Sequence, residues 1–360
     1  MTDTSILVGI EGPTNAFSSD EENLGMRLVV QVTNDGGGIH GRQLVPRGYP
    51  RAGGAGIEDA VANVKRLVEQ DDVFVVFNHG GPASVSIAPY AMQRRVPYLF
   101  PHTALLTADA DRYVFTSYPR YLGETQVMLR ELAVTRHFTR IGIIHDENEY
   151  GRFFFNQLTE NAGRFGYVVA GARSLRERTP ADLTGELADL RKSSPDAIIL
   201  ALYPEQARRV MEAKARLDWR SVRMVSTGPL TDEQYLNVAG GYADGTLGFC
   251  YYPDPNASDE PGVAEYRRLM ARYYPGHAVN RYSLYGYAFG NLLVEGLRRT
   301  GADLTRERFI DAMESIQDWT SGGIMPPVSF SKTNHHAQRA GFICELEDGR
   351  FRALGGWTEP

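Results

Sequence analysis

Two segments of the sequence carry residues that could hold a small anion. Residues 78–84 (Asn-His-Gly-Gly-Pro-Ala-Ser) follow the apolar run 73–77. Residues 101–104 (Pro-His-Thr-Ala) follow a second apolar run. Glycine lets a backbone approach a ligand closely, and the first turn of a helix presents free N–H groups that bind a carboxylate without a cationic side chain. We therefore predict a carboxylate site at these segments; the alternative is that both are ordinary turns between a strand and a helix.

Tyrosine is abundant, with 19 residues, and two tyrosines also follow apolar runs. Tyr150 comes after residues 140–145, and Tyr203 comes after residues 197–202. A tyrosine side chain combines an apolar ring with a polar tip, which suits a small-molecule pocket. We predict that Tyr150 and Tyr203 face a pocket, whereas Tyr287 lies inside a long predicted helix and belongs to the core.

Motifs that would indicate an enzyme are missing. None of the four lysines follows a glycine, and the chain has no Gly-x-Ser-x-Gly and no Cys-x-x-Cys sequence. Residues 36–41 match Gly-x-Gly-x-x-Gly, but they end a predicted helix and precede a strand, so we interpret them as a helix cap and turn. His335 and His336 are adjacent and point in different directions, which favours a solvated loop over a metal site. We predict no enzyme, no metal and no cofactor.

The elements that must position these segments alternate between short apolar runs and stretches with helical periodicity. Residues 73–77 form a near-continuous apolar run, which is typical of a parallel strand covered by helices on both faces. Residues 57–68 place apolar side chains on one helical face and charged ones on the other. The alternation restarts after residue 120 and changes character in the last third. This order predicts an α/β fold with parallel sheets in two similar lobes.

Composition narrows the class of protein further. The chain has 360 residues, of which 42% are hydrophobic, and a net charge of −6 at pH 7. These values are typical of a globular protein with two domains or slightly more, and they argue against a nucleic-acid partner. The longest charge-free stretch, residues 73–93, contains glycines and prolines and is not a membrane span. Cys250 and Cys344 allow one disulfide at most, and the sequence leaves open whether it forms.

Five segments in order along the chain resemble the leucine/isoleucine/valine-binding type of periplasmic solute-binding protein, the receptors of ABC importers. The first begins at Val8-Gly9-Ile10, and the second, Asn34-Asp35-Gly36-Gly37-Gly38-Ile39-His40-Gly41-Arg42, matches an Asn-x-x-Gly-Gly-Ile-x-Gly pattern of the family. The others are residues 141–151, 243–248 and 327–330.

The resemblance implies the type I periplasmic binding protein fold, which has two Rossmann-like parallel-sheet lobes joined by three crossovers and a ligand cleft between the lobes. The crossovers fall near residues 118–121, 248–251 and 326–328. The first lobe then comprises residues 1–118 and 251–325, and the second comprises residues 119–250 and 326–360.

The resemblance also implies ligand contacts. The family's serine loop falls near Gly81, its Ala-Ala-Thr turn falls on residues 102–104, and its two pocket tyrosines fall on Tyr150 and Tyr203. Aromatic wall residues correspond to Phe17 and Tyr282. The complete set of predicted ligand-binding residues is Phe17, His79, Gly80, Gly81, His102, Thr103, Ala104, Tyr121, Tyr150, Tyr203, Thr227 and Tyr282.

The chain departs from the family pattern at the amine end of the ligand. Amino-acid binders of the family place a carboxylate after the strand that corresponds to residues 223–226, where it pairs with the α-ammonium group. Here the sequence is Thr-Gly-Pro-Leu over residues 227–230. A buried ammonium without a counter-charge is costly. Either Glu124, Asp146 or Glu147 supplies the charge, or the ligand is an acid without an amine, such as an aromatic acid. Gly81 and Ala104 also stand where the family has hydroxyl side chains.

We predict a receptor that binds a small carboxylate-bearing solute, either a branched-chain or related amino acid or an amine-free acid, by closure of its lobes. Its partners are the ligand and ABC permease subunits in the membrane, and we expect a monomer. The chain opens without a signal peptide, so a periplasmic location implies an export signal outside this sequence. The alternative is a cytoplasmic sensor of the same fold that binds an amide or amino-acid-type ligand and regulates gene expression.

Overall fold

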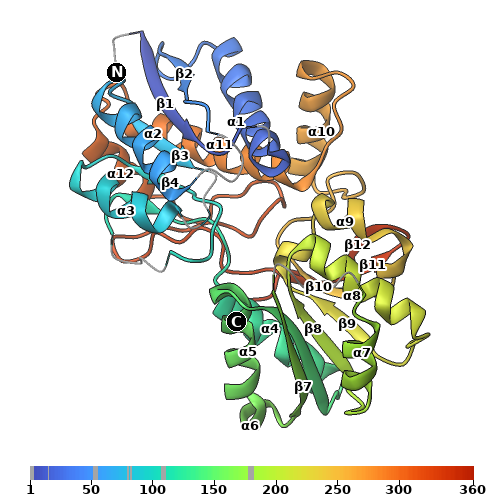
Figure 1. The fold of residues 1–360 in the computed structure, drawn as a ribbon. Helices are drawn as coiled ribbons and strands as arrows, with labels where there is room; N and C mark the ends of the chain where they lie inside the picture. Colours follow the sequence, from blue (N-terminus) through green and yellow to red (C-terminus); the bar gives the residue numbers. More distant parts are fainter. Residues whose placement is uncertain are drawn as a thin grey trace. The chain divides into compact units, whose positions relative to one another are not determined.

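The computed structural model describes residues 4–14, 16–51, 56–78, 81, 83–106, 111–176 and 182–360. The chain forms two compact units, each with its own sheet (Figure 1). The first unit comprises Met1–Arg120 and Pro255–Arg339, and the second comprises Tyr121–Asp254 and Ala340–Pro360. Each unit is an α/β structure built on parallel strands, so the predicted fold class is confirmed.

The first unit contains a five-stranded parallel sheet in the order β2-β1-β3-β4-β5. Its strands are β1 (Ser5–Glu11), β2 (Gln43–Arg47), β3 (Val75–Asn78), β4 (Tyr98–Leu99) and β5 (Val114–Phe115). Its helices are α1 (Phe17–Asp35), α2 (Ile57–Glu69), α3 (Ala83–Gln93), α10 (Pro261–Tyr273), α11 (Arg281–Thr300) and α12 (Arg306–Glu314). The helices α2 and α3 pack on the sheet through a core cluster that includes Val64, Ile87 and Val76. The helix α1 lies along α11 (Figure 1).

The second unit contains a seven-stranded sheet in the order β12-β11-β10-β9-β8-β6-β7. Its strands are β6 (Arg140–Asp146), β7 (Val168–Leu175), β8 (Ala197–Ala201), β9 (Arg223–Ser226), β10 (Leu247–Cys250), β11 (Phe342–Glu347) and β12 (Arg350–Ala353). The strands β6 to β10 are parallel, and β11 and β12 add an antiparallel edge. Its longer helices are α4 (Tyr121–Leu129), α5 (Glu149–Glu160), α7 (Thr184–Arg191), α8 (Pro204–Arg216) and α9 (Glu233–Ala239). Its shorter ones are η1 (Arg130–Thr135), α6 (Ala162–Phe165), η2 (Gly228–Leu230) and η3 (Gly240–Ala243).

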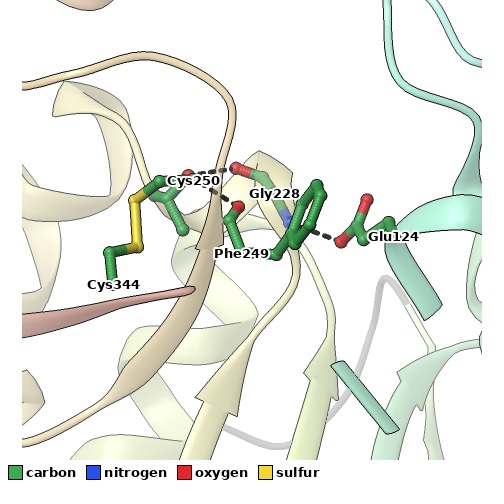
Figure 2. The surroundings of a disulfide bond; sticks show 6 residues. Glu124, Gly228, Phe249, Cys250 and Cys344 are labelled. Atoms are coloured by element: carbon green, nitrogen blue, oxygen red, sulfur yellow. Dashed lines mark hydrogen bonds between the residues drawn. A yellow bond between two sulfur atoms is a disulfide. The ribbon is translucent and has the colours of Figure 1, made fainter. Parts of the chain in front are cut away.

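A disulfide joins Cys250 of β10 to Cys344 of β11, with Cα atoms 6.0 Å apart (Figure 2). In the antiparallel ladder, Cys344 stands opposite Gly248, two residues before its bonded partner. Both side chains are buried in the core of the second unit. The sequence left open whether Cys250 and Cys344 form a disulfide, and in the structure they do.

The glycine-rich residues 36–41 end α1 and lead into β2, as predicted for a helix cap and turn. Gly37, Gly38 and Gly41 all have positive φ angles, which glycine adopts without steric cost. A second turn joins β11 to β12 at Asp348 and Gly349, where both φ angles are positive, as in a type I′ hairpin.

Two expectations about the last part of the chain are wrong. The resemblance assigned residues 326–360 to the second lobe, but residues 326–339 lie in the first unit. The reason is that this segment pairs with the end of β5: the Thr116 N–H donates to the His335 carbonyl, and the Ala337 N–H donates to the Thr116 carbonyl. His335 and His336 also do not form a solvated loop, because both are buried. The His335 ring stacks on Phe115 with a centroid distance of 4.1 Å.

Among the residues that the structure describes, no helix combines the length and the apolar character that a membrane span requires.

Candidate functional site

The predicted site residues of the first unit lie beyond the carboxyl ends of its strands. Phe17 begins α1 after β1, and residues 102–104 follow β4. Tyr118, which was not among the predicted site residues, follows β5. Because all five strands are parallel, these positions belong to one edge of the sheet, which is where α/β proteins bind ligands. Two predicted residues of the loop after β3, His79 and Gly80, lie outside the described residues.

The chain between β1 and α1 is held by a buried ion pair. The Arg51 guanidinium lies 2.6 Å from the Glu11 carboxylate at the end of β1. The carbonyl of Arg51 accepts hydrogen bonds from the Thr14 N–H at 2.6 Å and from the Thr14 hydroxyl at 2.8 Å. Both charged side chains are almost completely buried, so the pair is protected from solvent screening. It positions the segment that leads to Phe17.

His102 is held by a buried carboxylate and by tyrosine rings. Its Nδ1 lies 3.0 Å from Glu22 Oε2, and the Glu22 side chain has no exposed surface. A carboxylate only accepts hydrogen bonds, so His102 Nδ1 is the donor. The imidazole stacks on Tyr285 at 4.6 Å between centroids and lies 4.4 Å from the ring of Tyr118.

The structure brings three predicted residues, Phe17, His102 and Tyr282, into one cluster. The ring of Tyr282, in α11, lies 5.6 Å from His102 and 5.9 Å from Phe17, in an edge-to-face arrangement with the latter. Phe17 is 42% exposed. We call Phe17, His102, Tyr118, Tyr282 and Tyr285 the aromatic wall of the first unit.

Three further predicted residues of the first unit have ordinary structural surroundings. The Thr103 hydroxyl accepts a hydrogen bond from the Leu105 N–H at 3.2 Å, and Ala104 is buried. Gly81 has a φ of +72°, and its carbonyl accepts the Ser84 N–H at the start of α3. A role for these residues in ligand binding stays a prediction.

The predicted residues of the second unit also form one cluster. Tyr150 lies in α5 after β6, Tyr203 precedes α8 after β8, and Thr227 follows β9. These three strands are neighbours in the sheet and parallel. The ring of Tyr150 lies 5.4 Å from that of Tyr121 and 5.7 Å from that of Tyr203. We call Tyr121, Tyr150, Tyr203 and Thr227 the tyrosine cluster.

A directed chain of hydrogen bonds runs through this cluster. The hydroxyls of Tyr150 and Thr227 lie 2.6 Å apart, and Thr227 donates its single proton to the Leu200 carbonyl at 3.0 Å. Tyr150 is therefore the donor to Thr227, and its oxygen keeps acceptor capacity. Burial raises the pKa of Tyr150 well above its ordinary value, so the hydroxyl stays protonated. Tyr203 is 48% exposed and accepts a hydrogen bond from Asn148 Nδ2 at 3.1 Å.

The three acids that could have paired with a ligand ammonium are all engaged within the second unit. Glu124 accepts the Gly228 N–H at 2.7 Å on one oxygen and the Tyr251 hydroxyl on the other. The two oxygens of Asp146 accept the Asn148 N–H at 2.9 Å and Gln206 Nε2 at 2.7 Å. The oxygens of Glu147 bind Arg176 at 2.8 Å and Ser174 at 3.1 Å.

Comparison with known protein families identifies the family of this chain. Residues 6–350 match the family described as periplasmic binding protein. The chain belongs to this family. Its members are binding proteins without enzymatic activity, so the chemistry of this periplasmic binding protein is recognition. The leucine/isoleucine/valine-binding resemblance is thereby confirmed.

Solved structures of similar proteins agree with the fold of this periplasmic binding protein. A branched-chain amino acid ABC transporter protein from Thermus thermophilus, with bound valine, has a TM-score of 0.83 at 15% identity over 99% of this chain and 96% of that chain. A substrate-binding periplasmic protein from Ralstonia solanacearum has a TM-score of 0.80 at 21% identity, over 99% and 100%. A fatty acid ABC transporter substrate-binding protein from Thermomonospora curvata has 0.81 at 20% identity, over 100% and 94%. No curated protein matches the chain at the sequence level.

Sequence reasoning missed the buried partner of His102 in this periplasmic binding protein. Glu22 lies on the helical face that also carries Met26 and Val29, and all three are buried. The spacing of four and seven residues was the available signal, because it places a carboxylate on the apolar face of the predicted helix. A carboxylate on such a face needs a partner, and His102 provides one.

The Tyr150–Thr227 hydrogen bond is expected to contribute about 1 kcal/mol to the stability of the second unit. We expect Tyr150→Phe, Thr227→Val and the double variant to show a coupling energy of that size in a double-mutant cycle, measured by urea unfolding. Tyr242→Phe is the matched control, because Tyr242 is 55% exposed. Additive effects of the two single changes would show that the bond is not formed in solution.

Proposed function

We propose that this protein is the substrate-binding component of an ABC importer and takes a small carboxylate-bearing solute by closure of its two units. The observation that carries the proposal is the gathering of ring and hydroxyl groups at the carboxyl ends of the strands in each unit. The aromatic wall supplies flat apolar surface, and the tyrosine cluster supplies surface with polar tips. Closure follows ligand contacts that are better in the closed form than in the open one.

The ligands named for two structural relatives support a carboxylate group on the solute. The Thermus thermophilus protein holds valine, and the Thermomonospora curvata protein is named for fatty acids. These ligands share a carboxylate and differ in the amine. In this chain, the loop after β3 and the residues at 102–104 are the proposed carboxylate-binding segments, with Gly81 two residues before α3.

Within this class we favour an acid without an amine. Glu124, Asp146 and Glu147 use their oxygens for protein donors, so an ammonium bound beside them would have to break one of those bonds. A buried ammonium that lacks a counter-charge loses several kcal/mol, roughly a hundredfold or more in affinity. An aromatic or branched aliphatic acid avoids this cost and packs on the rings; a branched-chain or related amino acid is the competing ligand class.

The disulfide supports a location outside the cytoplasm. Disulfides between buried cysteines persist in oxidising compartments such as the periplasm and are rare in the reducing cytosol. We therefore propose a periplasmic receptor that works as a monomer with membrane permease subunits. The alternative, a cytoplasmic sensor of the same fold, agrees less well with a disulfide, because the cytosol is reducing.

Calorimetric titration with matched pairs of ligands tests the proposal. The pairs are leucine with 4-methylpentanoate, valine with 3-methylbutanoate, and phenylalanine with 3-phenylpropionate, with benzoate and cinnamate as further acids. We expect at least one amine-free acid to bind about a hundredfold tighter than its amino acid. Tighter binding of the amino acids would overturn the amine-free class. Failure of every acid and amino acid to bind would overturn the proposed function itself.

A further inference from the structure

The second unit contains a buried carboxyl group that lies beside the tyrosine cluster without belonging to it. Glu124, on α4, is completely buried, and the structure gives it two donors, the Gly228 N–H and the Tyr251 hydroxyl. Gly228 is the residue after Thr227, so one of these bonds is made to the loop that presents a proposed ligand contact. Figure 2 shows the Glu124 carboxyl directed at Gly228.

Position 228 has no room for a side chain. A Cβ atom built on Gly228 would lie well under 3.0 Å from the ring and hydroxyl of Tyr251. Tyr251 follows β10 directly, and it fills the space beside the loop while its hydroxyl reaches Glu124. Tyr251 thus stands where a side chain at position 228 would otherwise point.

Gly228 is also held through its carbonyl. The Thr231 hydroxyl donates to the Gly228 carbonyl at 2.7 Å and lies 3.4 Å from the carbonyl of Phe249 in β10. The Leu230 N–H closes the turn on the Thr227 carbonyl at 2.9 Å. Both polar groups of the Gly228 backbone therefore have side-chain partners, and the N–H depends on Glu124.

We propose that Glu124 is a positioning residue for ligand binding, which fixes the Thr227–Gly228 loop, and through it the Tyr150 hydroxyl, while its ionised carboxylate accepts from Gly228 and Tyr251. An ionised carboxylate matches two donors. A protonated carboxyl group carries a hydrogen on one oxygen. When that oxygen faces Tyr251, the Tyr251 hydroxyl can no longer donate to it and has to rotate. The proposal rests on the proposed function, since it concerns the same cluster of residues.

The surroundings of Glu124 place this change near neutral pH. Burial raises the pKa of Glu124 to about 7, and the Tyr251 and Gly228 hydrogen bonds lower it. The titratable groups that face it are Tyr251 after β10, Tyr121 on α4 and Tyr150 on α5. Burial raises the pKa of both Tyr121 and Tyr150, so these phenols stay neutral while Glu124 titrates.

The direct test is the pH profile of affinity for 3-methylbutanoate and 3-phenylpropionate between pH 6 and pH 8. We expect wild-type affinity to rise about tenfold across this range, because ionisation restores a charged hydrogen bond to the loop. The amide of Glu124→Gln imitates the protonated form. This variant is expected to bind the acids about tenfold more weakly than wild type at pH 8, and its affinity is expected to lack the step, that is, the rise between pH 6 and pH 8. Equal affinity and equal profiles in wild type and Glu124→Gln would overturn the proposal while leaving the proposed function intact.

Two further variants separate positioning from mere structural support. Tyr251→Phe removes a hydrogen bond that lowers the pKa of Glu124, so the step is expected to move to higher pH. His102→Gln tests the competing explanation, because histidines titrate in the same pH range. His102 belongs to the aromatic wall of the first unit, so this variant is expected to bind more weakly at every pH, and only the pH dependence of its affinity is compared. The step has to survive in His102→Gln; its disappearance there would assign it to the histidine and refute our proposal.

A measurement without ligand keeps the test independent of the proposed function. At pH 8, amide hydrogen exchange of residues 227–231 is expected to be about tenfold faster in Glu124→Gln than in wild type. Exchange in the β11–β12 hairpin serves as the internal reference. Unchanged exchange at residues 227–231 would overturn the proposal even if no acid binds.

Discussion

Replacing Cys250 and Cys344 together by alanine is expected to lower the free energy of unfolding of the second unit by about 3 kcal/mol. The disulfide spans 94 residues of sequence, but residues 255–339 of that span belong to the first unit, so only the short segments on either side of them become free when the second unit unfolds. Removing it returns conformational entropy to the unfolded state, and this effect grows with loop length. Alanine is the better replacement because both side chains are buried in an apolar cluster, where serine would bring a hydroxyl group.

Hydrogen exchange at increasing urea concentration resolves the two units and is the measurement of choice. Peptides from β10 and β11 should lose protection at lower urea in the variant, whereas peptides from α2 and α3 should not change. Wild-type protein reduced in denaturant is the matched control, since it keeps both sulfur atoms and loses only the cross-link. Equal stability of the variant and the oxidised wild type, or thiols that titrate in unreduced denatured protein, would show that the bond does not form.

The features that sequence analysis predicted correctly are those that leave a local pattern. β6 carries five consecutive buried residues, and such a run identifies a strand covered on both faces before any partner is known. Once the strands are parallel, residues that follow them must share one edge of the sheet. That rule placed Tyr150 and Tyr203 near each other, and their rings lie 5.7 Å apart.

The features that it missed depend on contacts between distant residues. The burial of His336 rests on a hydrogen bond to Thr116, 220 residues away in the sequence. The bond from Gly228 to Glu124 spans 104 residues. A polar residue carries no local sign that a distant donor or acceptor will satisfy it, so a loop of polar residues such as 334–336 is predicted to be solvated. The pairing of the cysteines is hidden for the same reason.

Gly286→Ala is expected to destabilise the first unit by about 3 kcal/mol and to weaken ligand binding. A Cβ atom built on Gly286 of α11 would lie well under 3.0 Å from the Glu22 carbonyl in α1. A Cβ on Gly25 of α1 would meet the Ser283 carbonyl of α11 in the same way. Both obstacles are backbone atoms, so the helices can accept a methyl group only by moving apart.

Such a movement reaches the aromatic wall directly, because its members are divided between the two helices and the loops beside them. Phe17 begins α1, Tyr282 and Tyr285 belong to α11, and Glu22, which holds His102, lies on α1. We expect affinity for the preferred acid of the calorimetric panel to fall about tenfold or more, as edge-to-face and stacking contacts are lost. Gly163→Ala in α6 is the control, since no atom lies within 4 Å of a Cβ built there. If Gly286→Ala matched this control in both unfolding and affinity, the close contact of α1 with α11 would not exist in solution, and the aromatic wall would lose the framework that holds it together.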